Sequence, residues 1–124
     1  MSASLAEAVE GIGGVFFRAT DPDALRSWYS DHLGIVMEDY GTTFTARDGD
    51  QTVWAPFAMD SGYFGRADQQ SMVNFRVRDL DRMLEQLRAA GVEVDSKVAE
   101  HEFGRFGWAT DPEGNRFELW QPPS

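Results

Sequence analysis

The fold is decided by one stretch near the end of the chain, Asp111-Pro112-Glu113-Gly114-Asn115-Arg116-Phe117-Glu118-Leu119-Trp120-Gln121-Pro122. Its first half is a turn signal, because proline presets φ and the glycine and asparagine tolerate positive φ. Its second half alternates, so that Phe117 and Leu119 share one face of a strand. The other face carries Glu118 between Arg116 and Trp120. We therefore predict a strand with one core face and one face that presents a carboxylate.

Length and composition predict a folded domain. The chain has 124 residues, 42% hydrophobic and 13% aromatic, which is enough to build a core without staples. Cysteine is absent, which excludes disulfides and thiolate sites and fits the reducing cytoplasm. The first ten residues do not resemble a secretory signal, and no stretch approaches the roughly 20 apolar residues of a membrane span.

The charge balance restricts the partners. The formal net charge is −10 and the pI is near 4.4, so the overall field opposes nucleic acid and anionic membrane. We expect neither as a partner. A small neutral or cationic ligand is easier to accept than a polyanion, although acidity also serves solubility alone.

The elements along the chain repeat. Residues 1–10 are expected to form an N-terminal arm that is either a frayed helix or disordered. We then predict a strand over 11–19, followed by a helix that is capped by Thr20 or Asp21 and ended by Gly34. Three strands follow over 35–40, 42–46 and 51–57. A linker over 58–70 precedes the same order again: a strand over 72–77, a helix ended by Gly91, and strands over 92–98, 104–110 and 115–121. We interpret this as an internal repeat.

The two halves resemble the vicinal-oxygen-chelate superfamily, which comprises the glyoxalases, bleomycin-resistance proteins and extradiol dioxygenases. The motifs are the Tyr-x-x-x-Leu-Gly pattern from Tyr29 to Gly34 and the Asp-Pro-Glu-Gly-Asn-Arg-Phe-Glu-Leu run at 111–119. The resemblance implies an α+β fold: two tandem βαβββ modules, about 11–57 and 71–122, whose curled mixed sheets enclose a shared cleft in a single domain at 11–124. It also implies a homodimer. Function still has to be argued from the site.

The resemblance also implies a divalent metal at four positions, which the repeat places at Gly14, Thr52, Met72 and Glu118. Only Glu118 is a good ligand, because glycine has no side chain, the thioether is soft and a threonine hydroxyl binds weakly. A catalytic zinc site needs three protein ligands. We therefore expect no cofactor and no metal of the usual kind. The alternative is an irregular divalent-metal site that combines Glu118 with His101.

Strand alternation places further residues beside those four positions, and we predict that together they line the ligand-binding cleft. The predicted cleft residues are Phe16, Arg18, Thr52, Trp54, Met72, Asn74, Arg76, Arg116 and Trp120. The residues predicted to pack under the helices are Val15, Phe17, Val53, Val73, Phe75, Phe117 and Leu119.

Each cleft residue also has a simpler explanation. Glu118 is either a catalytic base or ligand anchor, or a buried carboxylate paired with Arg76 or Arg18. Trp54 and Trp120 either stack on a ligand or fill the core.

Three functions remain after the sequence analysis. The first is a binder of a small planar or aromatic molecule, similar to the bleomycin-resistance proteins. The second is a lyase, isomerase or dioxygenase-type enzyme that uses Glu118 as base or metal ligand, with Arg76 or Arg18 stabilising an oxyanion. The third is a subunit with a vestigial cleft. In the linker, Tyr63 and Phe64 are expected to anchor packing rather than to form a flap.

Overall fold

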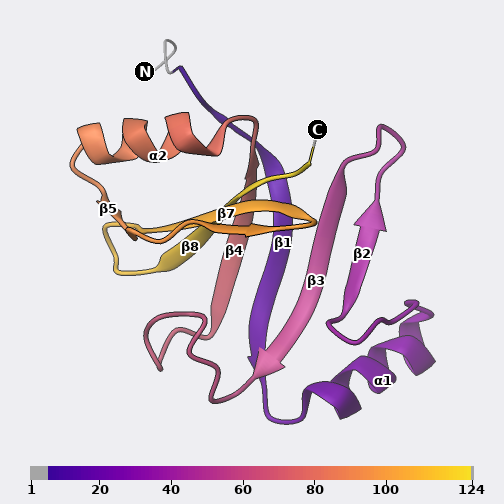
Figure 1. Ribbon diagram of the computed structural model, residues 1–124. Helices are drawn as coiled ribbons and strands as arrows, with labels where there is room; N and C mark the ends of the chain where they lie inside the picture. The colour runs from indigo at the N-terminus through magenta and orange to yellow at the C-terminus, as the bar shows by residue number, and fades with distance from the viewer. Residues whose placement is uncertain (1–5, 124) are drawn as a thin grey trace. The chain divides into compact units, whose positions relative to one another are not determined.

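A computed structural model describes residues 6–123 and divides them into two compact units (Figure 1). The first unit spans residues 13–73. The second combines residues 74–123 with residues 6–12. The boundary near residue 73 lies close to the predicted start of the second module. No helix among the described residues is long and apolar enough to cross a membrane.

The first unit consists of one helix and a small mixed sheet. Strand β1 (Val9–Ala19) enters it at Gly13, and α1 (Pro22–Leu33), β2 (Thr42–Thr45) and β3 (Gln51–Ala58) follow. Strand β3 pairs in parallel with β1 and antiparallel with β2, which lies at the outer side of β3 in Figure 1. The predicted caps of α1 are confirmed. The Asp21 side chain accepts a hydrogen bond from the Ala24 N–H at 3.1 Å, and Gly34 ends the helix with a φ of 69°.

The strand predicted over residues 35–40 is wrong. The chain there folds back at Glu38 and Gly41, whose backbones exchange hydrogen bonds of 2.7 and 3.2 Å. This closed turn prevents an extended conformation. Gly41 has a φ of 141°, and a Cβ there would lie 2.0 Å from the Trp54 carbonyl oxygen, so the turn and its close approach to β3 both require glycine.

The second unit holds the other helix and a larger mixed sheet. It contains the end of β4 (Ser71–Val77) from Asn74, α2 (Leu80–Ala89), β5 (Glu93–Val94), β6 (Ala99–His101), β7 (Gly104–Thr110) and β8 (Arg116–Gln121). The strand order is β4-β8-β7-β5, and β6 also pairs with β7. Strand β8 is parallel to β4 and antiparallel to β7, so it lies between them.

The strand predicted over 92–98 is interrupted. Asp95 uses its carboxylate oxygen Oδ1 to accept a hydrogen bond from the Lys97 backbone N–H at 2.9 Å. This side-chain bond to a residue two positions ahead is a turn interaction, which competes with the sheet. Only the short strand β5 therefore lies within the predicted run, and β6 begins after it at Ala99.

The core of the second unit lies between α2 and its sheet. Its fully buried members are Val77, Leu80, Met83, Leu84 and Leu119, and Phe75, Leu87, Val94, Val98 and Phe117 pack against them. Gly107 on β7 permits this packing, because a Cβ at this position would lie only 3.1 Å from Leu84 Cδ1. The predicted core face of β8, formed by Phe117 and Leu119, is confirmed.

The described part of the N-terminal arm, residues 6–10, differs from the predicted arm. The Glu7 backbone N–H donates to Gln86 Oε1 and its carbonyl accepts from Gln86 Nε2, both at 3.1 Å. The buried Glu7 carboxylate also accepts a hydrogen bond from Arg78 at 2.8 Å. These contacts attach the segment to α2 and its N-terminal flank, and β1 begins at Val9. The remainder of the predicted arm, residues 1–5, lies outside the described residues.

The fold class is α+β, as predicted, with the helices and mixed sheets distributed over both units. The shared cleft between curled sheets stays a prediction.

Truncation of Leu119 tests the predicted core. Leu119→Ala should lower the free energy of unfolding by about 2–5 kcal/mol, because it removes buried methyl groups and leaves a cavity under α2. Met59→Ala is the control, since the apolar Met59 side chain is 46% exposed, and it should change this free energy far less. Urea denaturation followed by circular dichroism measures both. Equal losses in the two variants would contradict the core assignment.

Candidate functional site

The predicted site residues are divided between the two units. The first unit contains Gly14, Phe16, Arg18, Thr52, Trp54 and Met72. The second unit contains Asn74, Arg76, His101, Arg116, Glu118 and Trp120.

In the second unit, the side of the sheet opposite α2 brings several of these residues together. Glu118 on β8 is in register with Asn74 on β4 and with Trp108 on β7. Trp120 is likewise in register with Arg76 and Phe106. We call this surface the Glu118 face and define it by Asn74, Arg76, Phe106, Trp108, Arg116, Glu118 and Trp120.

The Glu118 carboxylate is buried and bound from both sides. The side chain is only 1% exposed. Its Oε1 accepts a hydrogen bond from Asn74 Nδ2 at 2.6 Å, and its Oε2 accepts one from Trp108 Nε1 at 2.9 Å. Both donors are themselves buried, and such bonds are what makes a buried carboxylate tolerable. The sequence analysis missed Trp108, which the β7–β8 register places opposite Glu118.

Arg116 supports Trp108 from the outer end of the face. Its guanidinium carbon lies 5.2 Å from the centre of the Trp108 ring, and its Nη1 donates to Asp95 at 3.2 Å. Asp95 also donates its backbone N–H to the Trp108 carbonyl at 2.9 Å. The Lys97 backbone N–H, and then Arg116, hold the pKa of Asp95 below its usual value, against the opposing effect of burial.

Trp120 and Arg76 form the other end of the face. The Trp120 ring lies parallel to Phe106, with ring centres 6.1 Å apart, and its Nε1–H donates to the Phe103 carbonyl at 2.8 Å. Arg76 Nη1 donates to the Ile12 carbonyl at 2.7 Å. Trp120 is only 5% exposed, so its core-filling interpretation gains direct support.

In the first unit, Arg18 organises the linker. Its guanidinium donates to four backbone carbonyls: Gln69 at 2.8 Å, Met59 at 2.7 Å, Ser61 at 2.8 Å and Arg66 at 3.0 Å. A planar fork of five donors suits this arrangement. The structure therefore gives Arg18 a role in holding the loop, whereas the sequence analysis predicted a cleft or oxyanion role.

The linker aromatics anchor packing, as expected. Phe64 is fully buried and contacts the Phe57 ring edge to face, with the Arg18 guanidinium 4.9 Å from its centre. Tyr63 stacks on Phe57 with ring centres 5.5 Å apart, and Phe16 packs on Phe57 at 5.3 Å.

Trp54 does not lie on the face predicted for it. It is in register with Val15, and its ring contacts Phe17 and Tyr29 at centroid distances of 5.1 and 4.7 Å. Because Tyr29 belongs to α1, this face is the one turned to the helix, and alternation places Thr52 there as well.

The error arose from aligning Trp54 with Trp120. The observed registers pair Phe16 with Ala55 and Asn74 with Glu118, so Ala55 is the counterpart of Glu118 when the two strands are compared. The alignment of Trp54 with Trp120 instead makes Thr52 the counterpart of Glu118. Thr52 and Ala55 are an odd number of residues apart, and an odd shift turns every side chain of a strand to the other face.

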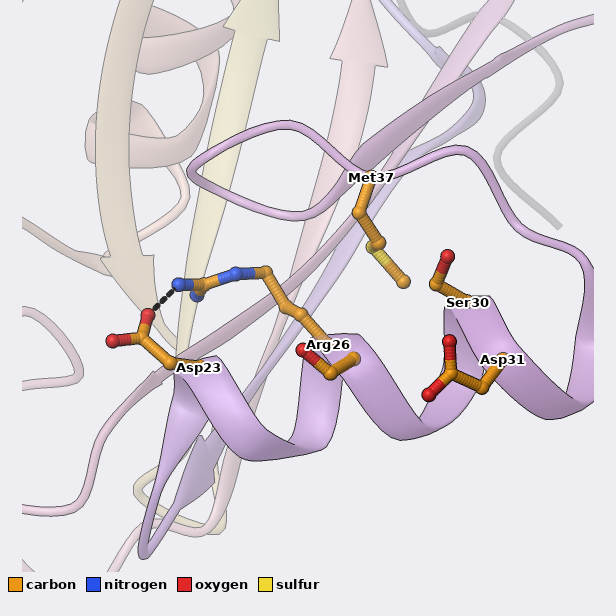
Figure 2. A pocket seen from close by; sticks show the side chains of 6 residues that line it. Asp23, Arg26, Ser30, Asp31 and Met37 are labelled. Atoms are coloured by element: carbon orange, nitrogen blue, oxygen red, sulfur yellow. Dashed lines mark hydrogen bonds and ion pairs between the residues drawn. The ribbon is translucent and has the colours of Figure 1, made fainter.

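A separate hollow of about 300 Å³ lies along α1 in the first unit (Figure 2). Its lining residues are Asp23, Arg26, Ser27, Ser30, Asp31 and Met37. None of them is a predicted site residue. Arg26 is paired with Asp23 at one end of the hollow, as the dashed line in Figure 2 shows.

The family model described as Glyoxalase/Bleomycin resistance protein/Dioxygenase superfamily matches residues 11–119. The chain belongs to this superfamily. A search of curated proteins finds no match.

Solved structures of the same superfamily fold are similar to this chain. A Streptomyces coelicolor methylmalonyl-CoA epimerase in complex with 2-nitronate-propionyl-CoA has a TM-score of 0.74 and 17% identity, and the match covers 94% of this chain and 100% of that one. The Mycobacterium tuberculosis methylmalonyl-CoA epimerase gives 0.68 and 21%, with 100% and 93% covered. A catechol 2,3-dioxygenase gives 0.65 and 22%, with 94% and 41% covered. These likenesses concern the fold.

The residues of this superfamily member do not fit the divalent metal that its family implies. At the predicted positions only Glu118 carries a carboxylate or imidazole, and both of its oxygens accept N–H bonds. His101 is opposite Gly104 in the β6–β7 pairing, and Glu118 is opposite Trp108 in the β7–β8 pairing. Gly104 and Trp108 are four residues apart on β7, so these two pairings are about 13 Å apart along the strand. Residues 6–123 contain no group of three His, Cys, Asp or Glu side chains that could hold a metal ion.

The lowered pKa of Asp95, caused first by the Lys97 backbone N–H and then by Arg116, predicts a pH dependence of stability. Because its pKa is lowered in the folded state, Asp95 stabilises the fold above its unfolded pKa of about 4, and this contribution disappears as the pH falls through the folded pKa. Asp95→Asn should therefore lower the melting temperature at pH 7, and this loss should shrink below about pH 4. Thermal melts between pH 7 and 3 measure it. Asp60→Asn, at an exposed carboxylate, is the control, and a pH-independent loss in Asp95→Asn would contradict the assignment.

Proposed function

We propose that this superfamily member binds a small planar or aromatic organic molecule at the Glu118 face, without the family's usual divalent metal. The observation that carries the proposal is the buried Glu118 carboxylate, fixed between Asn74 and Trp108. A buried ionisable group costs more stability than an apolar residue of similar size, so its presence supports a functional role.

The surroundings of Glu118 support a planar ligand. The half-buried Phe106 ring lies on the same face as the carboxylate, and an aromatic ring offers a flat apolar surface to a flat ligand. The net charge of −10 disfavours a polyanion. We retain a cytoplasmic location in this proposal because the chain contains no cysteine.

The alternative is an enzyme in which Glu118 is a general base and Arg76 on the neighbouring strand stabilises an oxyanion. The register that places Arg76 opposite Trp120, two residues from Glu118, favours this second candidate. The similar solved structures include epimerases and a dioxygenase. A lyase, isomerase or dioxygenase-type reaction would follow from this arrangement.

Elemental analysis tests the proposal. After incubation with Zn, Mn, Ni and Fe followed by dialysis, the protein should retain far less than one metal ion per chain. Stoichiometric metal that disappears in Glu118→Ala would overturn the metal-free proposal.

A ligand screen that reads tryptophan fluorescence follows, with Trp108→Phe identifying the signal from the Glu118 face. Glu118→Gln should alter affinity in a binder but abolish turnover in an enzyme, and Glu85→Gln, an exposed substitution of the same kind on α2, is the control. If no compound in a broad screen gives a saturable signal, the binding proposal fails.

We also propose that the protein forms a homodimer through the first unit. Several large apolar side chains of this unit are between 46% and 77% exposed: Trp28, Leu33, Val36, Tyr40 and Phe44. Strand β2 is the end strand of its sheet, and the described strand contains no lysine or proline that would discourage pairing with another chain.

Phe44→Lys should therefore convert the dimer to a monomer, because it places a charge on the edge strand. Sedimentation velocity measures the mass. Phe103→Lys changes a phenylalanine of the second unit that is 58% exposed, against 49% for Phe44, and should leave the dimer intact. A monomeric parent protein would contradict the proposal.

A further inference from the structure

We infer that the Glu118 face recognises a cationic nitrogen of its ligand, an ammonium or amidinium group, through the Asn74 Oδ1 acceptor beside the Glu118 carboxylate. The inference rests on the proposed function and names the ligand class for the same site.

The first argument is the orientation of Asn74. Its Nδ2 donates to Glu118 Oε1 at 2.6 Å. The reversed amide would bring two acceptor oxygens together, so the carboxylate fixes which end of the amide faces it. Oδ1 is therefore held as an acceptor that points away from this hydrogen bond.

The second argument is that this acceptor has no donor. Asn74 is 2% exposed, and its Oδ1 is the one buried side-chain polar atom in residues 6–123 without a hydrogen-bond partner. Buried polar atoms in native proteins are nearly always satisfied by protein, water or ligand. An exposed asparagine would meet this need with bulk water, but Asn74 requires a donor that enters the site.

The third argument concerns the charge of that donor. The acceptor, Asn74 Oδ1, belongs to an amide that is hydrogen-bonded to the Glu118 carboxylate. A cationic donor is therefore stabilised both by Asn74 Oδ1 and by the negative charge of Glu118. A carbonyl, carboxylate or phosphate oxygen of a ligand would add another acceptor and leave Oδ1 unsatisfied. The Trp108 indole N–H does not serve such an oxygen, since it already donates to Glu118. Of the two guanidinium groups on the Glu118 face, that of Arg116 is paired with Asp95, and that of Arg76 donates to the Ile12 carbonyl.

The test compares four small aromatic probes of similar size: benzylamine and benzamidine, which are cationic donors, and benzaldehyde and benzoate, which offer only acceptors. Titrations are followed in ¹H–¹⁵N spectra through the Trp108 indole and Asn74 side-chain amide signals, which Trp108→Phe and Asn74→Leu assign. We expect the two cations to shift both signals saturably, with dissociation constants at least tenfold below those of the acceptor probes.

The variants complete the test. Asn74→Leu should weaken the binding of both cations at least tenfold, whereas Asn115→Leu, the same substitution in an exposed turn, should not. If Asn74→Leu fails to fold, Asn74→Ala replaces it. This variant removes the same Oδ1 acceptor with a smaller side chain and should also weaken the binding of both cations at least tenfold.

The outcomes separate this inference from the proposed function. If benzaldehyde or benzoate shifts the Trp108 signal with equal or higher affinity, the cation inference fails and the proposed binding face stands. If cation binding is unchanged in Asn74→Leu, or in Asn74→Ala where that variant replaces it, the inference also fails, and an internal water is then the donor to Asn74. If no probe binds, the cation inference fails, and the broad ligand screen decides the binding proposal.

Discussion

A carboxylate withdrawn from water needs hydrogen-bond donors, and the sheet of the second unit supplies them to Glu118 from both neighbouring strands. Asn74 comes from β4 and Trp108 from β7, so only the strand between these two could carry the acid. The next residue of the same strand, Leu119, belongs to the core under α2. A slip of one residue in β8 would place the carboxylate against α2 and the leucine beside Asn74. The site and the core therefore depend on one register.

Local chemistry was sufficient to predict much of the fold. The alternation of β8 identified Phe117 and Leu119 as core residues, and the cap residues Asp21 and Gly34 marked the ends of α1. The segment over 35–40 was mispredicted because a pair of backbone hydrogen bonds closes it into a turn, and backbone groups are the same in every residue.

The differences between the predicted and the observed site have a common cause. The positions and contacts of these side chains depend on strand register and on main-chain groups that are distant in the sequence. Trp54 was assigned to the wrong face because the parallel pairing of β1 with β3 is set by packing against α1, and similar Trp-x-Pro patterns do not encode it. The loop-holding role of Arg18 was not predicted because all four acceptors of its guanidinium are main-chain carbonyls of the linker. Trp108 was missed because its partner is known only once β7 and β8 are aligned.

The attachment of the linker to Arg18 determines where the two halves of this chain are separable. Arg18 is 5% exposed in the fold, and a first half that ends before residue 59 would keep this arginine but lose every carbonyl that its guanidinium contacts. A first half that extends through Gln70 keeps them all, together with the Arg18 N–H bond to the Gln70 carbonyl. The segment that the sequence suggests is a flexible joint is thus part of the first unit. Any duplication, fusion or exchange of such modules has to carry this loop along with the strand that holds Arg18.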